Sequence, residues 1–455
     1  MAIAVVLVLL VVGSIIFHLV SPWWFTDIAS HWANIDFTVN LTFWVTGFVF
    51  IAVNLFLAYS VYRYRQSKDT PDNKAVYEPE NARLETGLTI LTALGVAAML
   101  APGLFVWAQF VTVPEDATEF EAFGSQWQWA FRYPGDDGVM GTADISHISE
   151  TNPWGINPAD PAGQDDLVVK APYMALPVDQ PVKALLRSRD VLHNYTVPQF
   201  RAKMDMVPGM VSYMWIEPTR TGVFDVLCEQ YCGLGHHIMR AQIEVMEPAD
   251  YEQWLDQQMT FAETQSLPEG SVSAGRQAYA TCASCHGQNG EGNQAMNAPK
   301  LAGLQDWYIA RQLRYYSEGV RGANPDDSAG QMMAPMAAMV NSEEARLNVA
   351  AYIESLPDEP APATVEGDAE RGMRIYSANC AACHGAEAQG SWSTDAPALA
   401  GMSDWYLARQ LNNYRDGIRG GEDGDHYGYQ MTSMVKAMRT EAQQNDVIAY
   451  INTLR

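Results

Sequence analysis

Six cysteines stand in three close pairs, and each pair belongs to a local pattern with its own chemistry. The pairs are Cys228 with Cys232, Cys282 with Cys285, and Cys380 with Cys383. Closely spaced thiols can form disulfides, bind metals or attach cofactors. Because each pair lies next to histidine and no cysteine is left over, we expect all six to hold cofactors and no structural disulfide to form.

The first pair lies on a loop that is rich in soft metal ligands. Its candidate ligands are Cys228, Cys232, His236 and Met239, and a second imidazole stands upstream at His193. Thiolates, imidazoles and a thioether together select copper, whereas zinc has no use for the methionine. Two cysteines on one loop can bridge two copper ions, so that each histidine caps one ion while Met239 and a backbone carbonyl act as weak ligands. A reducible disulfide between the two cysteines is the alternative.

Each of the other two pairs is followed directly by a histidine, His286 or His384, and so forms a C-x-x-C-H motif. This motif attaches haem c. The two cysteines form thioethers to the porphyrin, and the histidine is the proximal ligand of the iron. A zinc knuckle would need further cysteines or histidines at each site, and the sequence does not offer them there.

The two haem motifs belong to an internal repeat. Adding 98 to the residue number aligns the second copy with the first, without a gap, from Cys282 to Ile353. Self-similarity at a fixed offset indicates a duplicated domain, with copies at 271–357 and 369–455. The final patterns RLNVAAYIESL and QNDVIAYINTL are typical of amphipathic helices that close each haem pocket.

The connections around the repeat suggest how the copies are attached. Residues 358–368, between the copies, are rich in Pro, Ala and acidic residues. Such a linker spans about 18 Å when flexible and up to about 34 Å when stiffened by proline, so we expect a tethered shuttle. The connection before the first copy, at 263–271, is shorter, so we expect the first haem to dock more rigidly near the copper.

Each haem also needs a sixth ligand, and a methionine sulfur would raise its potential. The downstream candidates are Met332, Met333, Met336, Met339, Met431, Met434 and Met438. The offset of 98 pairs Met333 with Met431. It also pairs Met336 with Met434. The copies resemble tandem class I cytochromes c, and this resemblance implies the first pair as ligands, with the second pair as the alternative.

The same resemblance gives one proline in each copy a role. Pro299 and Pro397 match the family proline whose carbonyl orients the proximal histidine. A plain turn proline is the alternative.

Three apolar segments, at 2–20, 39–62 and 86–110, approach the roughly 20 residues that a helix needs to cross a bilayer. The first segment could be a secretory signal, but it lacks a basic n-region and an A-x-A cleavage site, so a retained helix is favoured. Loop 21–38 has no Lys or Arg, whereas loop 63–85 has five. The positive-inside rule then places the second loop in the cytoplasm and everything after residue 110 outside, where bacteria attach haem c and load copper.

Residues 117–247 read as short strands separated by polar turns, which indicates a sandwich or barrel. The net charge is −25, yet residues 1–111 hold 5 Lys or Arg against 7 Asp or Glu, so the downstream part carries nearly all of it. This acidity argues against nucleic acid as a partner. It favours a basic partner protein or a simply solvated surface.

Residues 39–247 resemble subunit II of the haem–copper cytochrome oxidases, with its CuA cupredoxin domain. The resemblance is carried by the cysteine loop, the strand DVLH, the segment KMDMVPGM and the aromatic stretch GSQWQWAFRY. It implies a dinuclear CuA centre and an oxidase partner.

Three further residues acquire roles through this resemblance. The middle residue of the cysteine loop gives its backbone carbonyl to copper, and in the family its glutamate side chain binds Mg²⁺; here it is Gln230, which leaves the Mg²⁺ role in doubt. Trp127 matches the surface tryptophan through which electrons enter, with a buried core aromatic as the alternative. Glu85 matches a glutamate at the mouth of a proton-uptake channel, although a charged group there is often only interfacial.

The sequence thus predicts a multi-domain chain. Its expected parts are transmembrane helices at 1–20, 39–62 and 86–110, an all-β cupredoxin sandwich at 111–262, and all-α class I cytochrome c domains at 271–357 and 369–455, joined by a linker at 358–368.

The expected function is that of subunit II of a proton-pumping terminal oxidase in the bacterial inner membrane. Its copper and haem domains would lie on the periplasmic side and pass electrons from cytochrome c, or another donor, through two covalent haems c and CuA. The expected partners are subunit I, with haem a and CuB, and subunit III. A nitric oxide reductase subunit and a stand-alone membrane-anchored shuttle are the alternatives.

Overall fold

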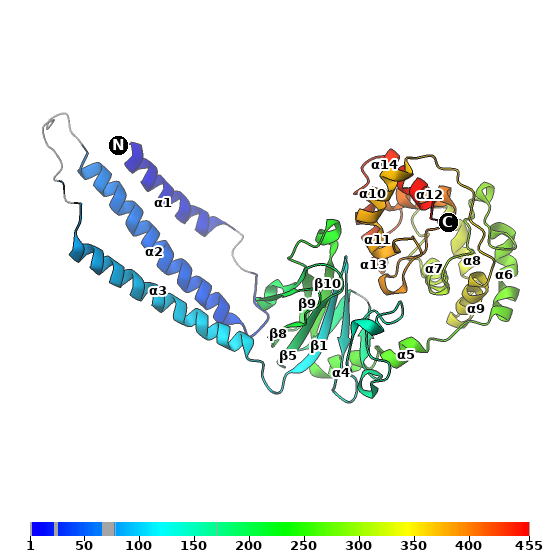
Figure 1. Cartoon of the computed structure of the whole chain (residues 1–455), viewed down its shortest axis with the longest axis horizontal. Coiled ribbons are helices and arrows are strands. Elements are labelled where there is room, and N and C mark those ends of the chain that lie inside the picture. The colour runs from blue at the N-terminus through cyan, green and yellow to red at the C-terminus, as the bar shows by residue number, and fades with distance from the viewer. Residues whose placement is uncertain (1, 22–25, 66–76, 78, 171, 455) are drawn as a thin grey trace.

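The computed structural model describes all residues except 1, 22–25, 66–76, 78, 171 and 455. Long helices occupy one end of the chain, a β-sandwich lies in the middle, and two small helical bodies lie beyond it (Figure 1). Lys68 and Lys74, two of the five basic residues on which the predicted orientation rests, lie outside the described residues.

Three helices have the length and composition of membrane spans. They are α1 (Ala2–Val20), α2 (Ala33–Arg63) and α3 (Ala82–Val111). The second and third are longer than the expected apolar windows, because helical hydrogen bonding continues into their polar ends. The start of α2 is also held from outside, since Trp32 is buried and its indole N–H donates to the Trp215 carbonyl at 3.2 Å.

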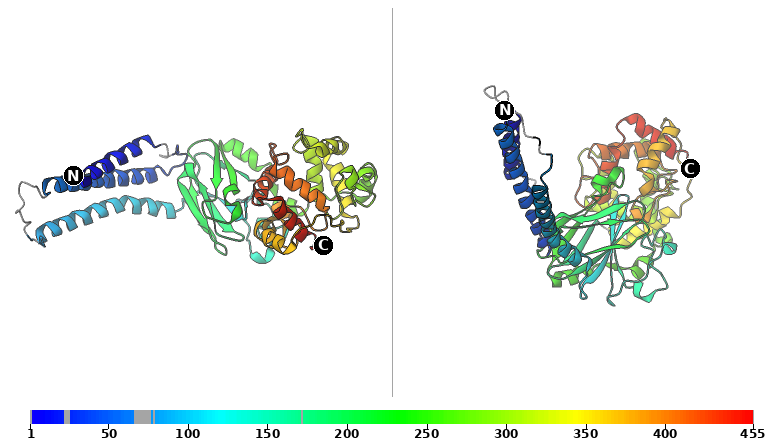
Figure 2. Two further views of the ribbon diagram at one scale, coloured as in Figure 1. Left: turned by 90° about the horizontal axis from the view of Figure 1, so that it is seen from above. Right: turned by 60° about the vertical axis from the view of Figure 1, so that its left-hand side comes forward.

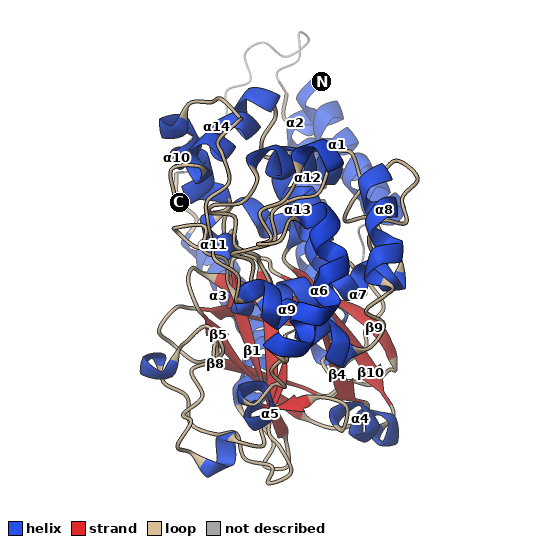
Figure 3. Cartoon of the chain, turned by 90° about the vertical axis from the view of Figure 1, so that its right-hand side faces the viewer, coloured by secondary structure: helices blue, strands red, loops and turns tan. Residues whose placement is uncertain are grey.

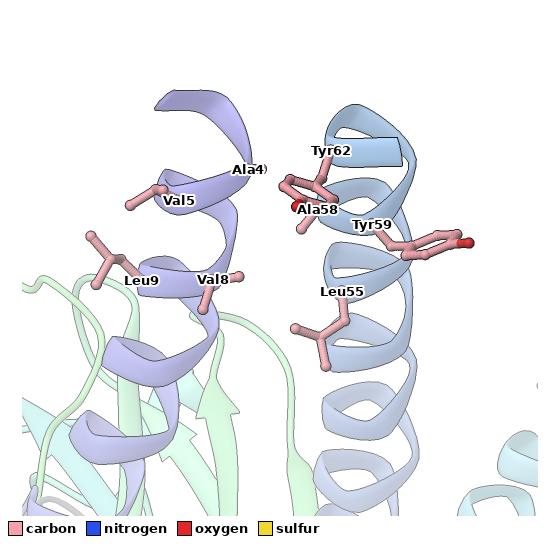
Figure 4. Close-up of a pocket in the computed structure, with 8 residues that line it drawn as sticks. All are labelled: Ala4, Val5, Val8, Leu9, Leu55, Ala58, Tyr59 and Tyr62. Carbon is pink, nitrogen blue, oxygen red and sulfur yellow. The ribbon is translucent and has the colours of Figure 1, made fainter. Parts of the chain in front are cut away.

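An apolar groove of about 420 Å³ separates α1 from α2 (Figure 4). Its lining is aliphatic apart from Tyr59 and Tyr62. It offers neither a metal ligand nor an acid–base pair, so the chemistry of the chain lies elsewhere.

Two sheets form the sandwich. Their strands are β1 (Thr118–Ser125), β2 (Gln128–Tyr133), β3 (Leu167–Val169), β4 (Tyr173–Pro177), β5 (Val182–Ser188), β6 (His193–Val197), β7 (Ala202–Met206), β8 (Ser212–Ile216), β9 (Gly222–Leu227), β10 (Arg240–Met246) and β11 (Met259–Thr260). One sheet has the order β11-β3-β2-β1-β5-β8 and the other β4-β10-β9-β6-β7. Buried and less buried residues alternate along β5, as expected for a strand with one face in the core.

The aromatic core of the sandwich holds the copper loop in place. Trp129 and Tyr195 meet edge to face, with ring centroids 5.7 Å apart, and both side chains are buried. The loop runs from the end of β9 to the start of β10 and contains the short 3-10 helix η4 (Leu234–Ile238). Cross-strand pairing of β9 with β10 therefore fixes both ends of the loop.

Short helices α4 (Pro248–Leu255) and α5 (Phe261–Gln265) lead from the sandwich to the repeat. The first copy contains α6 (Val272–His286), α7 (Asp306–Glu318), α8 (Ser328–Ala337) and α9 (Glu343–Glu354). The second contains α10 (Ala369–Asn379), α11 (Ala381–His384), α12 (Asp404–Arg415), α13 (His426–Val435) and α14 (Glu441–Ile451). The first and last helices of each copy pack together, as α6 on α9 and α10 on α14.

The second copy, not the first, lies against the sandwich (Figures 1 and 2). Figure 3 views the chain from the cytochrome side, with the helices of both copies in front of the strands. The expectation that the first haem docks near the copper is therefore wrong. The short connection at 263–271 limits how far the first copy can lie from the sandwich. It does not determine which copy docks, because that depends on specific contacts made by the second copy.

The segment between the copies is not a free tether. The backbone N–H groups of Thr364 and Val365 donate to the Asp404 carboxylate at 2.5 and 2.8 Å, and the Ala361 N–H donates to the Gly401 carbonyl. These bonds hold the linker along the second copy. The expectation of a tethered shuttle is corrected accordingly.

In each copy a glycine lets the first and last helices pack closely against each other. Replacing this glycine by alanine tests how much the close packing contributes to stability. A Cβ on Gly275 would lie 1.8 Å from the Asn348 oxygen, and one on Gly372 would lie 1.9 Å from the Asp446 oxygen. Because the helices would have to separate, we expect Gly275→Ala or Gly372→Ala to destabilise its copy by about 1–3 kcal/mol in thermal unfolding. Gly421→Ala, where a Cβ would meet only the Gly417 oxygen at 3.6 Å, should change stability little. Equal melting of all three variants would contradict the packing argument.

Candidate copper and haem sites

The predicted copper ligands lie together at one end of the sandwich. The sulfur atoms of Cys228 and Cys232 are 3.8 Å apart, which is too far for the roughly 2.05 Å bond of a disulfide. His193 Nδ1 lies 3.9 Å from the Cys228 sulfur, and His236 Nδ1 lies 3.6 Å from the Cys232 sulfur. The Met239 sulfur lies 3.8 Å from that of Cys232. Strand β6 and the β9–β10 loop thus supply one compact set of donors.

The donor chemistry of this cluster fits copper. Two buried sulfurs with an imidazole beside each of them form a soft, nearly dry site. Hydrogen bonds from Cys232 and His193 hold the pKa of the Cys228 thiol far below its usual range, so one thiolate is available without a metal. The Gln230 carbonyl oxygen lies 3.2 Å from the Cys228 sulfur, where a weak backbone ligand was expected.

A carboxylate behind the cluster orients one histidine. The Nε2 atom of His193 lies 2.8 Å from Asp190 Oδ1, which leaves Nδ1 to face the cysteines. Burial lowers the pKa of His193, but hydrogen bonds to Asp190 and Cys228 outweigh this and raise it above its usual value. Asp190 also accepts the backbone N–H of Gln126 at 2.7 Å.

Neighbouring polar residues of the loop point elsewhere. His237 is exposed, as expected for a solvated histidine. Glu229 is also exposed and pairs with Lys203 at 3.0 Å, so its carboxylate does not face the sulfurs.

The two C-x-x-C-H motifs close helices, with His286 at the end of α6 and His384 at the end of α11. The Nδ1 atoms of these imidazoles lie 2.8 Å from the carbonyl oxygens of Pro299 and Pro397. Because a carbonyl only accepts, each Nδ1 carries the proton and each Nε2 keeps its lone pair for a metal. Burial lowers the pKa of both histidines, which favours this neutral form.

Both motifs open into one cavity of about 850 Å³ that crosses the boundary between the copies. Its walls include Met333 and Met431, which pack on the cores of the first and second copy respectively. Met336 and Met434 line the cavity as well; Met336 is 44% exposed, and Met434 also packs against the core of the sandwich. The first methionine pair is thus the one that packs on the core of its own copy in both cases.

Two arginines related by the repeat lie in the wall of this cavity. Arg321 donates to Tyr406 at 2.6 Å and to Gln312 at 2.5 Å, and Arg419 donates to Gln312 at 3.0 Å. Both guanidinium groups are buried, and their Nε atoms have no acceptor among the described residues. A largely apolar cavity with two buried guanidinium groups, neither of which forms an ion pair with a described carboxylate, fits a pair of haems, whose propionates are anionic.

The second copy meets the sandwich beside the copper loop. The Cys383 sulfur lies 3.6 Å from the Gln126 carbonyl oxygen, and Gln128 Nε2 donates to the Thr394 carbonyl at 3.0 Å. Trp127 is only 4% exposed, and its indole N–H donates to the Cys232 carbonyl at 3.1 Å. This tryptophan, expected either at the surface or in the core, is buried beneath the junction.

Glu85 lies far from these sites, in the first turn of α3 at the opposite end from the sandwich (Figure 1). It is exposed, and its Oε1 accepts the Asn81 backbone N–H at 3.1 Å. The described contacts make it part of the helix N-terminus.

Residues at the domain junction were missed from the sequence. Lys170 of the sandwich and Asp395 of the second copy form an ion pair at 3.3 Å, and Arg311 of the first copy reaches the same carboxylate at 2.9 Å. No local pattern marks such long-range partners. The arginine pair at 321 and 419 did carry a signal, because the repeat offset relates the two positions.

Known proteins match the parts in the same order. The family model for the periplasmic domain of cytochrome c oxidase subunit II matches residues 118–246, and the cytochrome c model matches 272–357 and 369–455. The alternative cytochrome c oxidase subunit 2 of Bradyrhizobium diazoefficiens is 58% identical over 262 residues, which cover 58% of this chain and 94% of that protein. Cytochrome c oxidase subunit 2 of Cereibacter sphaeroides is 26% identical over 229 residues, which cover 47% and 75%. Reduced recombinant cytochrome c4 from Pseudomonas stutzeri is a similar solved structure, 26% identical with a TM-score of 0.33, matched over 41% of this chain and 100% of that one.

Fold and sites together define a membrane-anchored electron-transfer protein in which a copper-type sandwich is joined to two cytochrome c domains. The chain belongs to the cytochrome c oxidase subunit II family and is an electron-transfer subunit of a haem–copper oxidase. Its family domains imply copper in the sandwich and haem c in the repeat.

Removing one sulfur from the copper cluster tests the copper assignment. We expect Cys228→Ser to abolish the copper signal in electron paramagnetic resonance, because a serine hydroxyl cannot replace a thiolate ligand of copper. Both haem c absorption bands should remain. A persisting copper signal would show that these ligands are assigned wrongly.

Replacing the interior methionines tests the sixth ligand. Because a thioether ligand raises the haem potential, Met333→Ala and Met431→Ala should each lower the potential of one haem in a redox titration. Met336→Ala and Met434→Ala are the controls and should leave the potentials close to those of the parent chain. The reverse result would assign the second methionine pair.

Proposed function

We propose that this chain carries a dinuclear CuA centre and two covalently bound haems c, and passes electrons through them to the catalytic subunit I of a proton-pumping oxidase. The observation that carries the proposal is the ligand cluster of the sandwich beside a haem-attachment cysteine of the repeat. When bound, copper and haem iron each accept and release single electrons. The chain's own residues hold these groups in fixed positions and keep water away from them.

The proposed copper ligands are His193, Cys228, Gln230, Cys232, His236 and Met239. The two cysteines would share the copper ions, each histidine would bind one of them, and Gln230 would contribute only its carbonyl. Asp190 keeps His193 turned toward the sulfurs. Because all donors stand on paired strands or on the loop between them, their positions change little when an electron arrives or leaves.

The proposed haem ligands are Cys282, Cys285, His286 and Met333 in the first copy, and Cys380, Cys383, His384 and Met431 in the second. The proline carbonyls keep each histidine in the tautomer that binds iron. Arg321 and Arg419 would neutralise propionates inside this largely apolar cavity, where isolated carboxylates would be costly. We place the domain boundaries at 111–262, 271–357 and 369–455, with the linker at 358–368.

We further propose that helices at 1–20, 39–62 and 86–110 cross the bacterial inner membrane, with the sandwich on the periplasmic side. The described part of the α1–α2 connection supports this, because the Ala29 and His31 N–H groups donate to carbonyls of the sandwich. That connection must then lie on the same side as the copper. Trp127 relays electrons to the copper, and Glu85, at the other end of α3, stands where protons would be taken up.

The partner complex can be identified from its pigments. Affinity purification of the intact chain from membranes should retain a haem a spectrum, because the proposed acceptor is subunit I with haem a and CuB. Haem b with non-haem iron would instead indicate a nitric oxide reductase. A chain that always purifies alone would refute both complexes and leave a stand-alone shuttle.

A further inference from the structure

The closest approach of a haem-attachment residue to the copper domain is made by the second copy. The Cys383 sulfur, which would carry a thioether of the second haem, lies 3.6 Å from the main-chain oxygen of Gln126. The corresponding sulfur of the first copy, on Cys285, lies near the Ser284 hydroxyl of its own helix. The two haem sites therefore stand in different relations to the copper.

Gln126 also reaches the copper loop through its side chain. Its Nε2 donates to the Cys232 carbonyl oxygen at 2.8 Å. The next residue, Trp127, donates its indole N–H to the same oxygen at 3.1 Å. Two branches of similar covalent length thus leave the Gln126 carbonyl and meet at Cys232, whose sulfur belongs to the copper cluster.

The position of Gln126 is also fixed by Asp190, the residue that orients the copper ligand His193. Its backbone N–H donates to Asp190 at 2.7 Å, and the same carboxylate orients His193. Gly235 leaves room for the Trp127 ring, since a Cβ there would lie 2.4 Å from it. The contact between Gln126 and Cys383 is thus tied directly to the geometry of the copper ligands.

A junction of three domains holds the second copy in this place. Lys170 donates to the Trp392 carbonyl at 2.7 Å, lies 3.3 Å from the centre of the Trp392 ring, and pairs with Asp395. Arg311 of the first copy binds the same Asp395. The repeat places Asn297 at the matching position of the first copy, where it accepts from Arg409 at 3.1 Å. Only the docked copy carries the acid.

We propose that Gln126 is the electron bridge between the second haem and the copper centre. Its carbonyl couples the site of the Cys383 thioether electronically to the copper loop, and its amide, in parallel with Trp127, completes the coupling to Cys232, without Gln126 itself being oxidised or reduced. One electron moves, so haem iron goes from Fe(II) to Fe(III) while the copper pair is reduced by one electron, and no bond or proton changes place. The inference rests on the proposed function and adds an order to it, with the second haem last before copper.

Intramolecular electron transfer in the full, cofactor-loaded chain tests the bridge. After photoreduction of haem c, the rise of reduced copper is followed optically in the parent chain and in Gln126→Met. Methionine keeps the length of the side chain but has no N–H, so we expect a several-fold slower transfer. Gln126→Met combined with Trp127→Phe should be slower still, because both branches then lose their hydrogen bond. Gln242→Met, on an exposed position of β10, is the matched control and should transfer at the parent rate.

Two further measurements separate a bridge from a structural role. The copper resonance signal and the midpoint potentials of the haems and copper should be the same in Gln126→Met and in the parent chain. An unchanged transfer rate in both Gln126 variants would overturn the proposal, as would a copper signal that changes together with the rate. A parent chain that has copper and haem but shows no transfer between them would refute the proposed function itself.

The docking junction gives an independent variant. Asp395→Asn introduces the residue that the first copy has at this position, and both residues stand at a positive φ, 54° for Asp395 and 56° for Asn297. The backbone is therefore preserved while the attraction to Lys170 is lost. We expect Asp395→Asn to slow transfer at low salt and to make it less dependent on salt than in the parent chain, because the ion pair that salt screens is gone. Transfer in Asn297→Asp should depend on salt as in the parent chain. A rate and a salt dependence in Asp395→Asn equal to those of the parent would contradict docking through this junction.

Discussion

The carbonyl oxygen of Cys232 accepts two N–H groups, from Gln126 and Trp127, and the functional half of the molecule is arranged around this pair of bonds. They fasten the copper loop to the turn between β1 and β2. That turn, with the first residue of β2, is also the surface on which the second cytochrome copy rests, through Gln126 and Gln128. One acceptor therefore couples the shape of the metal site to the place where the haem domain docks.

The ion pair between Lys170 and Asp395 contributes more to the specificity of docking than to its free energy. Burial lowers the pKa of Lys170 to about 8 although Asp395 opposes this, so removal of the ammonium from water has a real cost. An ion pair with such a desolvation cost adds little net stability. A misplaced second copy, however, would leave Lys170 without the Trp392 carbonyl, the indole face and the carboxylate together. The junction thus selects one arrangement among those that the linker length allows.

The sequence was most informative where ligands are close neighbours along the chain. The cysteine loop and both C-x-x-C-H motifs could be recognised because copper and haem impose spacing on local residues, and the repeat offset narrowed the methionines to two pairs. The docked copy could not be predicted, because it depends on Lys170 meeting residues more than 200 positions away. The burial of Trp127 could not be predicted for the same reason. This side chain packs against Cys232 and Gly235, which are distant from it in the sequence.

The duplication helps to explain how one chain can both receive and deliver electrons. The two copies share their histidine–proline contacts and bind each other through equivalent arginines, Arg311 and Arg409. They differ in the segment after the attachment motif, where the second copy has Trp392 and Asp395 and contacts the sandwich. In the first copy the equivalent of Asp395 is the exposed Asn297, beside the exposed Met296. The residues that contact the sandwich therefore differ between the copies, and the matching surface of the first copy, at Met296 and Asn297, is exposed.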